Sequence, residues 1–117
     1  MKQHNYYTYI LTNYNKTVLY TGITNDIEKR LYEYYFGINQ ESSFTSKYKC
    51  FYLLWYERHQ YVNHAIEHEK EIKGWTRAKK IILIEQENPN LTFLNSDIME
   101  WPPVNYHTEQ GGTLIGE

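Results

Sequence analysis

The sequence lacks three features that would assign it to a specialised class of protein. It has a single cysteine, Cys50, so no internal disulfide can form, and we expect a buried thiol because this residue lies in an apolar run. No apolar run reaches the roughly 20 residues that span a bilayer, and the residues after Met1 lack the apolar core of a signal peptide. These absences predict a cytoplasmic protein without a membrane partner.

A surplus of basic residues is also missing, since the formal net charge is −2. Residues 1–91 hold all twelve Lys and Arg against ten acids, which gives +2, whereas residues 92–117 hold four acids and no Lys or Arg, which gives −4. Nucleic-acid-binding proteins usually have a stronger basic balance. Any phosphate binding by this chain would therefore have to be local.

Tyrosine, by contrast, is abundant. Thirteen tyrosines and three tryptophans raise the aromatic content to 17% of a 117-residue chain, a length that suits one domain. A tyrosine ring buries apolar area while its hydroxyl needs a partner, so tyrosines can serve the core, an interface or catalysis. We expect most of them to belong to the scaffold.

A β-hairpin is predicted at the amino terminus. Residues 6–12 are β-branched and aromatic, as in a strand, and residues 17–24 form the returning strand. The asparagine-containing segment 13–16 between them predicts a turn, because asparagine tolerates left-handed geometry.

A helix is predicted to follow the hairpin. Asn25 has the form of its N-cap, and Gly37 the form of its C-terminal cap. Between them, Ile27, Leu31 and Tyr34 recur at helical spacing, which predicts one buried stripe.

The rest of the chain predicts an α+β fold. A surface loop is expected over residues 38–49 and a third strand over residues 51–57. A second helix is expected over residues 63–73, and a third helix, capped by Thr76, over residues 77–88. Residues 92–117 are expected to form an irregular acidic extension. We therefore expect a three-stranded antiparallel sheet flanked by helices in the order β-β-α-β-α-α, as a domain over residues 1–91.

Two tyrosine-bearing segments, Tyr7-Thr8-Tyr9 and Tyr20-Thr21-Gly22, lie close together in the sequence, and Arg30 follows one helical stretch later. Further characteristic blocks occur in order at residues 20–33, 44–48, 69–75 and 87–89. Over about residues 5–91 the chain resembles the GIY-YIG nuclease superfamily, in particular its small stand-alone bacterial branch. The first block lacks its Gly-Ile, and Thr21 replaces the central isoleucine.

The resemblance implies a metal-dependent endonuclease that hydrolyses phosphodiester bonds in nucleic acid, with DNA favoured over RNA. It implies that Tyr9 and Tyr20 position or deprotonate the attacking water, that Arg30 supports the phosphate, and that Glu69 binds one Mg²⁺ or Mn²⁺ ion. Tyr34 stands where close relatives often have histidine, and other branches accept tyrosine there. From the residues alone, cross-strand packing of the two tyrosines and a solvated Arg30 remain open alternatives.

Glu69 is informative because of its place on the helical wheel. It falls on the same predicted face as Ala65, Ile66 and Ile72, which are apolar. A carboxylate on a buried face must be paired or bound to a metal. A hard divalent cation suits it, and the alternative is an ion pair with a lysine or arginine.

Several residues are candidates for holding nucleic acid. Clustered cations can follow a phosphate backbone, and Gly22 could permit close approach of substrate or serve a turn. The expected nucleic-acid-binding residues are Gly22, Lys47, Lys70, Lys73, Arg77 and Lys80. Asn88 is a possible site residue equally explained as a helix stop, and the His64/His68 pair is expected on the surface.

A rival hypothesis is a catalytically weak or inactive nucleic-acid-binding or protein-interaction module that retains the same fold. It is favoured by the mild charge, by Tyr34 in the place of the histidine of close relatives, and by the expected lack of an appended specificity domain. A protein partner for target choice is possible, and the oligomeric state stays open.

Overall fold

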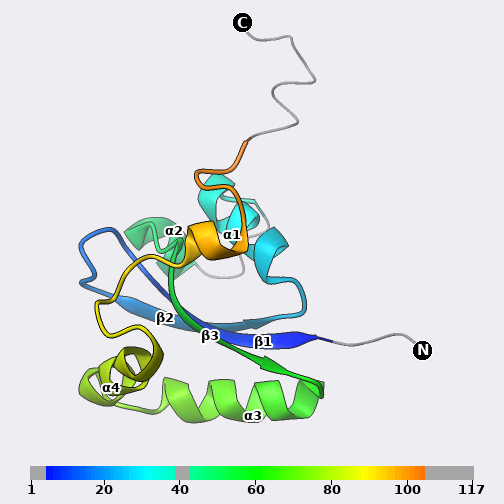
Figure 1. The fold of residues 1–117 in the computed structure, drawn as a ribbon, viewed down its shortest axis with the longest axis vertical. Helices are drawn as coiled ribbons and strands as arrows, with labels where there is room; N and C mark the ends of the chain where they lie inside the picture. The colour runs from blue at the N-terminus through cyan, green and yellow to red at the C-terminus, as the bar shows by residue number, and fades with distance from the viewer. Residues whose placement is uncertain (1–4, 39–42, 105–117) are drawn as a thin grey trace, which may run out of the picture.

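The computed structural model describes residues 5–38 and 43–104, and an antiparallel sheet lies at its centre (Figure 1). The strands are β1 (Tyr6–Thr12), β2 (Leu19–Thr24) and β3 (Tyr52–His59), in the order β2-β1-β3. The helices are α1 (Ile27–Phe36), α2 (Ser43–Tyr48), α3 (Val62–Lys73), α4 (Arg77–Glu87) and α5 (Asn95–Ile98). The predicted α+β fold with a three-stranded antiparallel sheet is confirmed.

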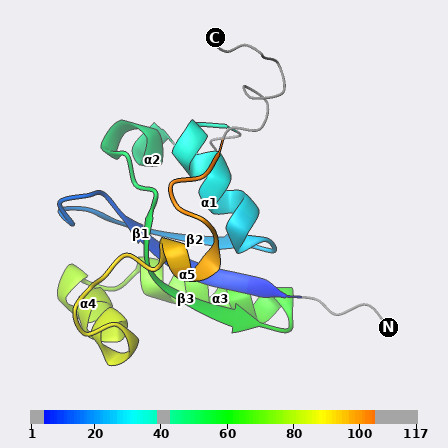
Figure 2. The ribbon, with the colours of Figure 1, turned by 45° about the horizontal axis from the view of Figure 1, so that its top comes forward.

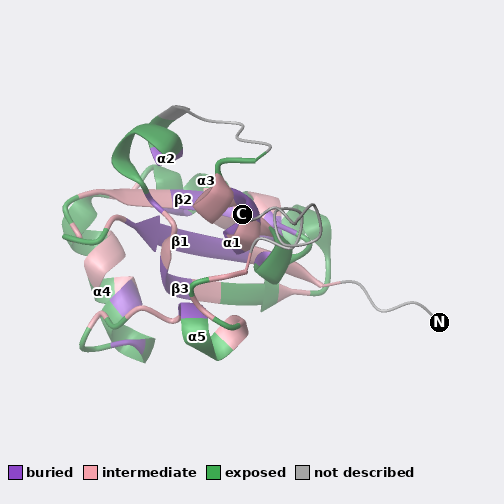
Figure 3. Cartoon of the chain, turned by 90° about the horizontal axis from the view of Figure 1, so that it is seen from above, coloured by how far each residue is buried: buried purple, intermediate pink, exposed green. Residues whose placement is uncertain are grey.

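The helices cover both faces of the sheet. Figure 1 shows α1 and α2 on one side and α3 and α4 on the other, and Figure 2 shows α5 beside β3. We call these two sides the α1 face and the α3 face. Because successive side chains along a strand point to opposite faces of the sheet, alternate residues of each strand lie on the α1 face and on the α3 face. Buried residues are concentrated in the central strand β1 (Figure 3).

The strand register decides which side chains meet on each face. Tyr9 lies opposite Gly22, and Leu11 lies opposite Tyr20, so these positions share the α1 face. A β-bulge interrupts the β1–β3 pairing: Ile10 pairs with Trp55 and Leu11 with Leu53, which leaves Leu54 as an extra residue. The bulge lets the consecutive residues Leu54 and Trp55 both pack in the core of the α3 face.

Local signals set most element boundaries as predicted. Asn13 Oδ1 accepts hydrogen bonds from the backbone of Thr17 and Val18 in the hairpin turn, where Lys16 takes the left-handed conformation. The N-cap of α1 is Asp26, one residue after the predicted Asn25. Its side chain accepts a hydrogen bond from Lys29 N.

Two other predicted helix caps, Gly37 and Thr76, lie where the sequence placed them. Gly37, with φ 68°, ends α1 in the left-handed region that favours glycine. Thr76 caps α4 by accepting from Lys79 N, as predicted.

Two short helices were not predicted, so the element order is longer than β-β-α-β-α-α. Helix α2 lies where an irregular loop was expected, and α5 lies in the expected extension. Within residues 92–104, Leu94 N donates to Leu53 O, and Leu94, Ile98 and Trp101 pack against the core of the α1 face. The domain end at residue 91 stays a prediction, but this part of the following segment contributes to the same core.

Candidate active site

Three tyrosines from three elements meet on the α1 face. The hydroxyls of Tyr9 on β1 and Tyr34 on α1 are 2.8 Å apart, within hydrogen-bonding distance. The ring of Tyr20 on β2 packs edge-on against that of Tyr34, with 6.2 Å between centroids. Tyr9 is 1% exposed, whereas the other two are half-buried. The structure thus brings together the two predicted tyrosines and adds Tyr34 between them.

Gly22 makes room for this cluster. A Cβ at this position would lie 2.5 Å from the hydroxyl oxygen of Tyr9 and 2.6 Å from its ring carbon Cζ. Gly22 lies inside β2, opposite Tyr9, and its φ is not positive. A turn requirement, one of the two explanations open from the sequence, is therefore wrong, because the glycine is needed where the phenol of Tyr9 passes over β2.

Burial fixes the protonation of the inner phenols. Burial raises the pKa of Tyr9 far above its usual value near 10, and Tyr34 adds to this increase. Burial also raises the pKa of Tyr34 to about 12, although its hydrogen bond with Tyr9 acts in the opposite direction. Both side chains are neutral near pH 7, so each can donate a hydrogen bond and neither is a ready base.

Arg30 lies beside the tyrosine cluster on α1. Its guanidinium carbon is 6.0 Å from the centroid of the Tyr34 ring, and its charge lowers the pKa of both Tyr9 and Tyr34. The same guanidinium lies 3.6 Å from Glu33 Oε1, and the Arg30 side chain is 23% exposed. A partly exposed cation next to neutral phenols can meet an anionic group arriving from solvent.

Glu69 is on the opposite side of the sheet from Tyr9, Tyr34 and Arg30, because α3 and α1 cover different faces. It lies on α3, and its Oε2 is 2.8 Å from Lys73 Nζ, which is the ion-pair alternative open from the sequence. Lys73 in turn lines a cavity of about 310 Å³ together with Tyr20 at the β2 edge. The hydrogen bond to Glu69 raises the pKa of Lys73, and Tyr20 adds to the increase. Lys73 thus pairs with Glu69 and also lines the cavity that contains Tyr20, whereas Glu69 is not among the residues that line this cavity.

The same cavity holds an aromatic residue and a second lysine. Phe44 of α2 stacks on Tyr20 with 6.0 Å between ring centroids and 26° between planes. Lys80 of α4 also lines the cavity, and burial together with the nearby Lys73 lowers its pKa. Phe44 belongs to the motif block at residues 44–48 but was not predicted as a site residue, and α2 was not predicted because its segment lacks an apolar repeat.

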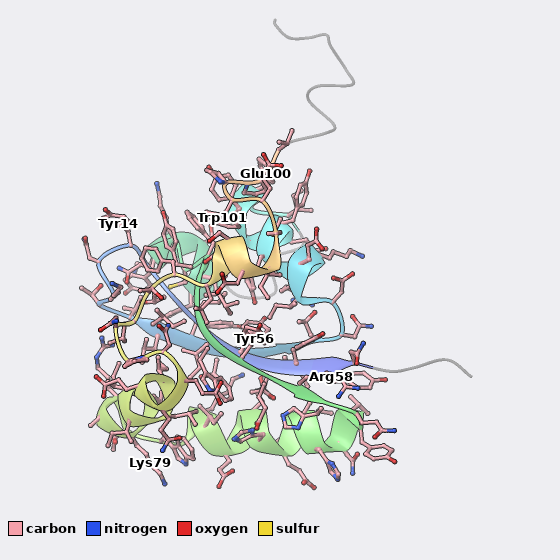
Figure 4. All side chains as sticks on the ribbon, viewed as in Figure 1. Tyr14, Tyr56, Arg58, Lys79, Glu100 and Trp101 are labelled. Atoms are coloured by element: carbon pink, nitrogen blue, oxygen red, sulfur yellow. The ribbon has the colours of Figure 1, made fainter. Side chains whose placement is uncertain are left out.

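The other predicted cations are dispersed. Arg77 donates to the backbone carbonyls of Lys16 and Thr17 at 2.7 and 3.2 Å, so it ties α4 to the hairpin turn. Lys47 on α2 lies over the ring of its neighbour Tyr48, and Lys70 is exposed on α3. Figure 4 shows Lys79 on the side of α4 and Trp101 on the opposite side of the sheet. Of the predicted cations, Lys73 and Lys80 are the two that share the cavity with Tyr20.

Asn88 has a structural position. Its side-chain nitrogen donates to Leu54 O and Thr92 O, while its oxygen accepts from the backbone N–H and the hydroxyl of Thr92. Both donor hydrogens and the acceptor oxygen are thus used within the fold, and the residue is 6% exposed. This agrees with the helix-stop interpretation.

The two histidines of α3 differ from each other. His64 is exposed, but His68 Nδ1 lies 2.6 Å from Glu57 Oε1 on β3. The prediction of a surface pair thus fits His64, whereas His68 is half-buried, with 23% of its side chain exposed and its ring against the end of β3.

The structure has tyrosines on adjacent strands of an antiparallel sheet and an arginine on the first helix, which is the arrangement that the resemblance to the GIY-YIG nuclease superfamily led us to expect. Residues 5–81 match the family model described as the GIY-YIG catalytic domain. The chain belongs to the GIY-YIG family, as its motifs predicted. This family lies in a nuclease superfamily that acts on nucleic acid and generally uses a divalent metal.

The chain is also similar to small proteins of this family. It is 34% identical over 86 residues to a UPF0213 protein of Bacillus pumilus (strain SAFR-032), covering 74% of this chain and 85% of the relative. It is 39% identical over 83 residues to one from Syntrophus aciditrophicus (strain SB), covering 71% and 92%. A solution NMR structure of a UPF0213 protein from Bacillus halodurans is 24% identical, with a TM-score of 0.48 and coverage of 74% and 88%. Among the described residues, none forms a helix long and apolar enough to cross a membrane.

Proposed function

We propose that the chain is an endonuclease that hydrolyses phosphodiester bonds with the help of one Mg²⁺ or Mn²⁺ ion, with DNA as its substrate. The observation that carries the proposal is the tyrosine cluster of Tyr9, Tyr34 and Tyr20, which has Arg30 on one side and the cavity containing Lys73 on the other. The sequence expectations of a cytoplasmic location and of a protein partner that selects the target belong to the same proposal.

Tyr20 is the member of the cluster suited to contact the attacking water. It lines the cavity, whereas Tyr9 is buried behind it and bonded to Tyr34. Tyr34, which is bonded to Tyr9, can hold the Tyr20 hydroxyl in place by a hydrogen bond. Tyr20 is near enough to Tyr34 to affect the pKa of Tyr34. In this scheme Tyr9 positions Tyr34 and Tyr20, and Tyr20 touches the water.

Arg30 would stabilise the charge that develops on the phosphate. Hydrolysis places additional negative charge on the phosphate oxygens in the transition state, and a preorganised cation lowers the energy of that state. A guanidinium can donate two parallel hydrogen bonds to such oxygens. Its partly exposed position beside Tyr34 leaves it accessible to a phosphate group.

Glu69 is the residue that would hold the metal. A single carboxylate, completed by water and phosphate oxygens, suits Mg²⁺ or Mn²⁺, and the half-buried position of Glu69 favours a compensating cation. Lys73 now supplies that positive charge, so metal binding requires Lys73 to turn away from Glu69. When bound, the ion would polarise the phosphodiester and lower the pKa of a coordinated water.

The cavity at the β2 edge would receive the nucleic acid. Lys73 and Lys80 are placed to contact phosphate oxygens, and the stacked pair of Tyr20 and Phe44 presents aromatic rings next to them. Cations that follow the backbone together with rings that stack on bases form a common arrangement for binding nucleic acid.

The ion pair between Glu69 and Lys73 also favours a second candidate, a nucleic-acid-binding module without activity. If the 2.8 Å contact persists with substrate present, Glu69 is a structural partner of Lys73 and holds no metal. The cavity and its lysines would then bind nucleic acid without cleaving it.

A cleavage assay separates the two candidates. The full chain is incubated with branched, single-stranded and duplex DNA and with matched RNA, with and without Mn²⁺, alongside Glu69→Gln and the control Glu71→Gln, which removes an exposed carboxylate from the same helix. Manganese-dependent cleavage that Glu69→Gln abolishes and Glu71→Gln keeps supports the nuclease. Binding without cleavage by the wild type on every substrate supports the module.

A further inference from the structure

A cluster of metal-binding side chains lies away from the tyrosines, between β3 and α3. Glu57, His59 and His68 each offer one ligand atom, and these atoms all lie within 4.8 Å of one another. His68 is half of the histidine pair that stands out in the sequence, and the proposed nuclease site uses none of the three residues.

The fold places these residues together for a definite reason. Glu57 and His59 are two apart on β3, so both side chains point to the same face of the sheet. Glu57 pairs with Thr8, whose hydroxyl donates to Ala65 O on α3, and this face is therefore the one that α3 covers. His68 lies one turn further along α3 and meets them there.

We propose that Glu57, His59 and His68 form a binding site for a transition-metal ion of the Zn²⁺ type, which joins the end of β3 to α3. Two imidazoles and one carboxylate make a ligand set that suits Zn²⁺ and its neighbours in the first transition series, not Mg²⁺. This site is separate from Glu69 and does not depend on the proposed nuclease activity.

The spacing of the ligand atoms fits such an ion with a small adjustment. In a tetrahedral zinc site with bonds of about 2.1 Å, two ligand atoms lie about 3.4 Å apart. His59 Nε2 is 3.4 Å from Glu57 Oε1, while His68 Nδ1 is 2.6 Å from the same oxygen. A rotation of the exposed Glu57 carboxylate would open the shorter distance, because this side chain is 45% exposed.

His59 gives an independent reason to expect a ligand here. Its Nε2 is buried and has no hydrogen-bond partner among the residues that the structure describes, since the approach of Glu57 at 3.4 Å lacks hydrogen-bond geometry. An unsatisfied buried nitrogen is costly, and a coordinated metal would satisfy it.

The surroundings leave room for a fourth ligand. Glu57 is on the exposed side of the cluster, so water can complete the coordination. The ring of His68 lies edge-on to both His59 and Trp55, at 5.6 and 5.8 Å between centroids, so Trp55 closes the inner side. The ion would thus occupy the rim between the sheet and α3, one residue along the chain from Glu69.

The test uses Zn²⁺ and Co²⁺ as probes on the full chain after treatment with a chelator. Calorimetry with Zn²⁺ is expected to give one ion per chain, and excess Mg²⁺ should not displace it. Co²⁺ is expected to produce the visible absorption of a site with nitrogen and oxygen ligands, without the thiolate band that Cys50 would add. Zn²⁺ should also raise the melting temperature, because it binds the folded state.

Substitutions identify the ligands. His59→Asn and His68→Asn should each weaken Zn²⁺ binding by roughly tenfold to a hundredfold or more. Loss of a residue that only hydrogen-bonds to a metal ligand already weakens binding by this factor, and loss of the ligand itself should cost no less. The controls Glu67→Gln, an exposed carboxylate next to His68, and Glu69→Gln should bind Zn²⁺ as the wild type does. Retained zinc binding in Glu69→Gln separates this site from the nuclease metal.

Two results would overturn the proposal. One is a wild-type chain that binds no Zn²⁺ and gives no Co²⁺ spectrum, an outcome that needs no variant to fold. The other is zinc affinity that stays unchanged in His59→Asn and His68→Asn variants whose circular dichroism matches that of the wild type.

Discussion

The two faces of the sheet differ in how their buried polar side chains are hydrogen-bonded. On the α1 face, buried phenols belong to the core, and the hydroxyls of Tyr9 and Tyr34 bond to each other. On the α3 face, the core is built from Ile10, Leu54 and Trp55 of the sheet with Ile72 and Ile84 of the helices. The α1 face therefore has hydrogen-bonded phenols within its core, whereas the core of the α3 face is mainly apolar packing and its polar clusters lie at the rim.

Unsatisfied polar atoms sharpen this contrast. Thr21 Oγ1, Trp55 Nε1 and His59 Nε2 are buried without a hydrogen-bond partner among the residues that the structure describes. All three belong to the α3 face, because Thr21 and Trp55 both pair with Ile10 and His59 points toward α3. Buried polar groups without partners reduce stability. The α3 face thus carries the unsatisfied buried polar atoms, whereas the phenols of Tyr9 and Tyr34 on the α1 face satisfy each other.

The largest expected effect follows from removing Arg30. If this guanidinium stabilises transition-state charge, Arg30→Ala should lower turnover by roughly 100-fold to 1000-fold, as for other single electrostatic donors, with a much smaller effect on affinity. Steady-state cleavage kinetics measure both quantities. Lys29→Ala, which removes the exposed charge next to it, is the control, and equal losses in the two variants would mean that only net charge matters.

Gly22→Ala should damage the tyrosine cluster directly. The new methyl group would meet the end of the Tyr9 ring, which is buried and cannot move freely, so we expect a loss of about 1–3 kcal/mol in the free energy of unfolding. Chemical denaturation measures it. The control is Gly74→Ala, whose Cβ would have its nearest contact at 3.5 Å and which should be tolerated. If both variants are equally stable, the cluster is less tightly packed than described.

Tyr34→Phe tests the bond between the two phenols. The substitution keeps the ring and leaves the buried Tyr9 hydroxyl without its partner, which should cost about 1–2 kcal/mol in unfolding free energy. Tyr9→Phe is the reciprocal variant. An unchanged stability in Tyr34→Phe would show that the hydroxyl pair does not contribute to the fold.

Thr21→Val is expected to have the opposite sign on the α3 face. Valine keeps the β-branched shape and removes a buried hydroxyl that has no partner among the described residues, so the chain should gain about 1 kcal/mol in stability. Thermal and chemical unfolding both measure this. A destabilised Thr21→Val would indicate that an ordered water or a ligand satisfies Thr21, and the contrast between the two faces would then weaken.

The smallest effect concerns alkaline pH. Because the folded state raises the pKa of Tyr34 from 10.0 to about 12, the unfolded chain loses this proton first. Stability from this group is fully present below about pH 10 and is lost as pH rises through the folded pKa. Between about pH 9 and 10.5 the free energy of unfolding of the wild type should therefore fall more than that of Tyr34→Phe, by a difference of less than about 1 kcal/mol. Equal slopes in the two chains would contradict the raised pKa of Tyr34.

The sequence predicted the elements whose pattern is periodic or capped. Alternation and helical spacing identified the hairpin and the helices now called α1, α3 and α4. Helix α2 could not be foreseen, because its segment SFTSKY has no apolar repeat, and α5 is held by tertiary bonds of Asn95 that no local pattern reveals. Tertiary context decided these two cases.

The motifs predicted which residues define the candidate site, but not how they are arranged. The depth of Tyr9 depends on the strand register, and its contact with Gly22 is a cross-strand relation. The pair of Glu69 with Lys73 was one of two outcomes that helical spacing allowed. The bulge beside Leu54 left no signal in the sequence, although it determines which face Trp55 reaches.

The bonds made by Asn88 and Asn95 have a consequence for how copies of the chain behave together. β3 is an outer strand of the sheet, and Asn95 bonds Leu53 N and Phe51 O while Asn88 donates to Leu54 O. These amides occupy the backbone groups through which an open edge strand would add a strand from another molecule. A chain cut after residue 91 would lose Asn95 and leave part of this edge unpaired. Such a chain should therefore be more prone to self-association, which light scattering would detect as a rise in mass with concentration.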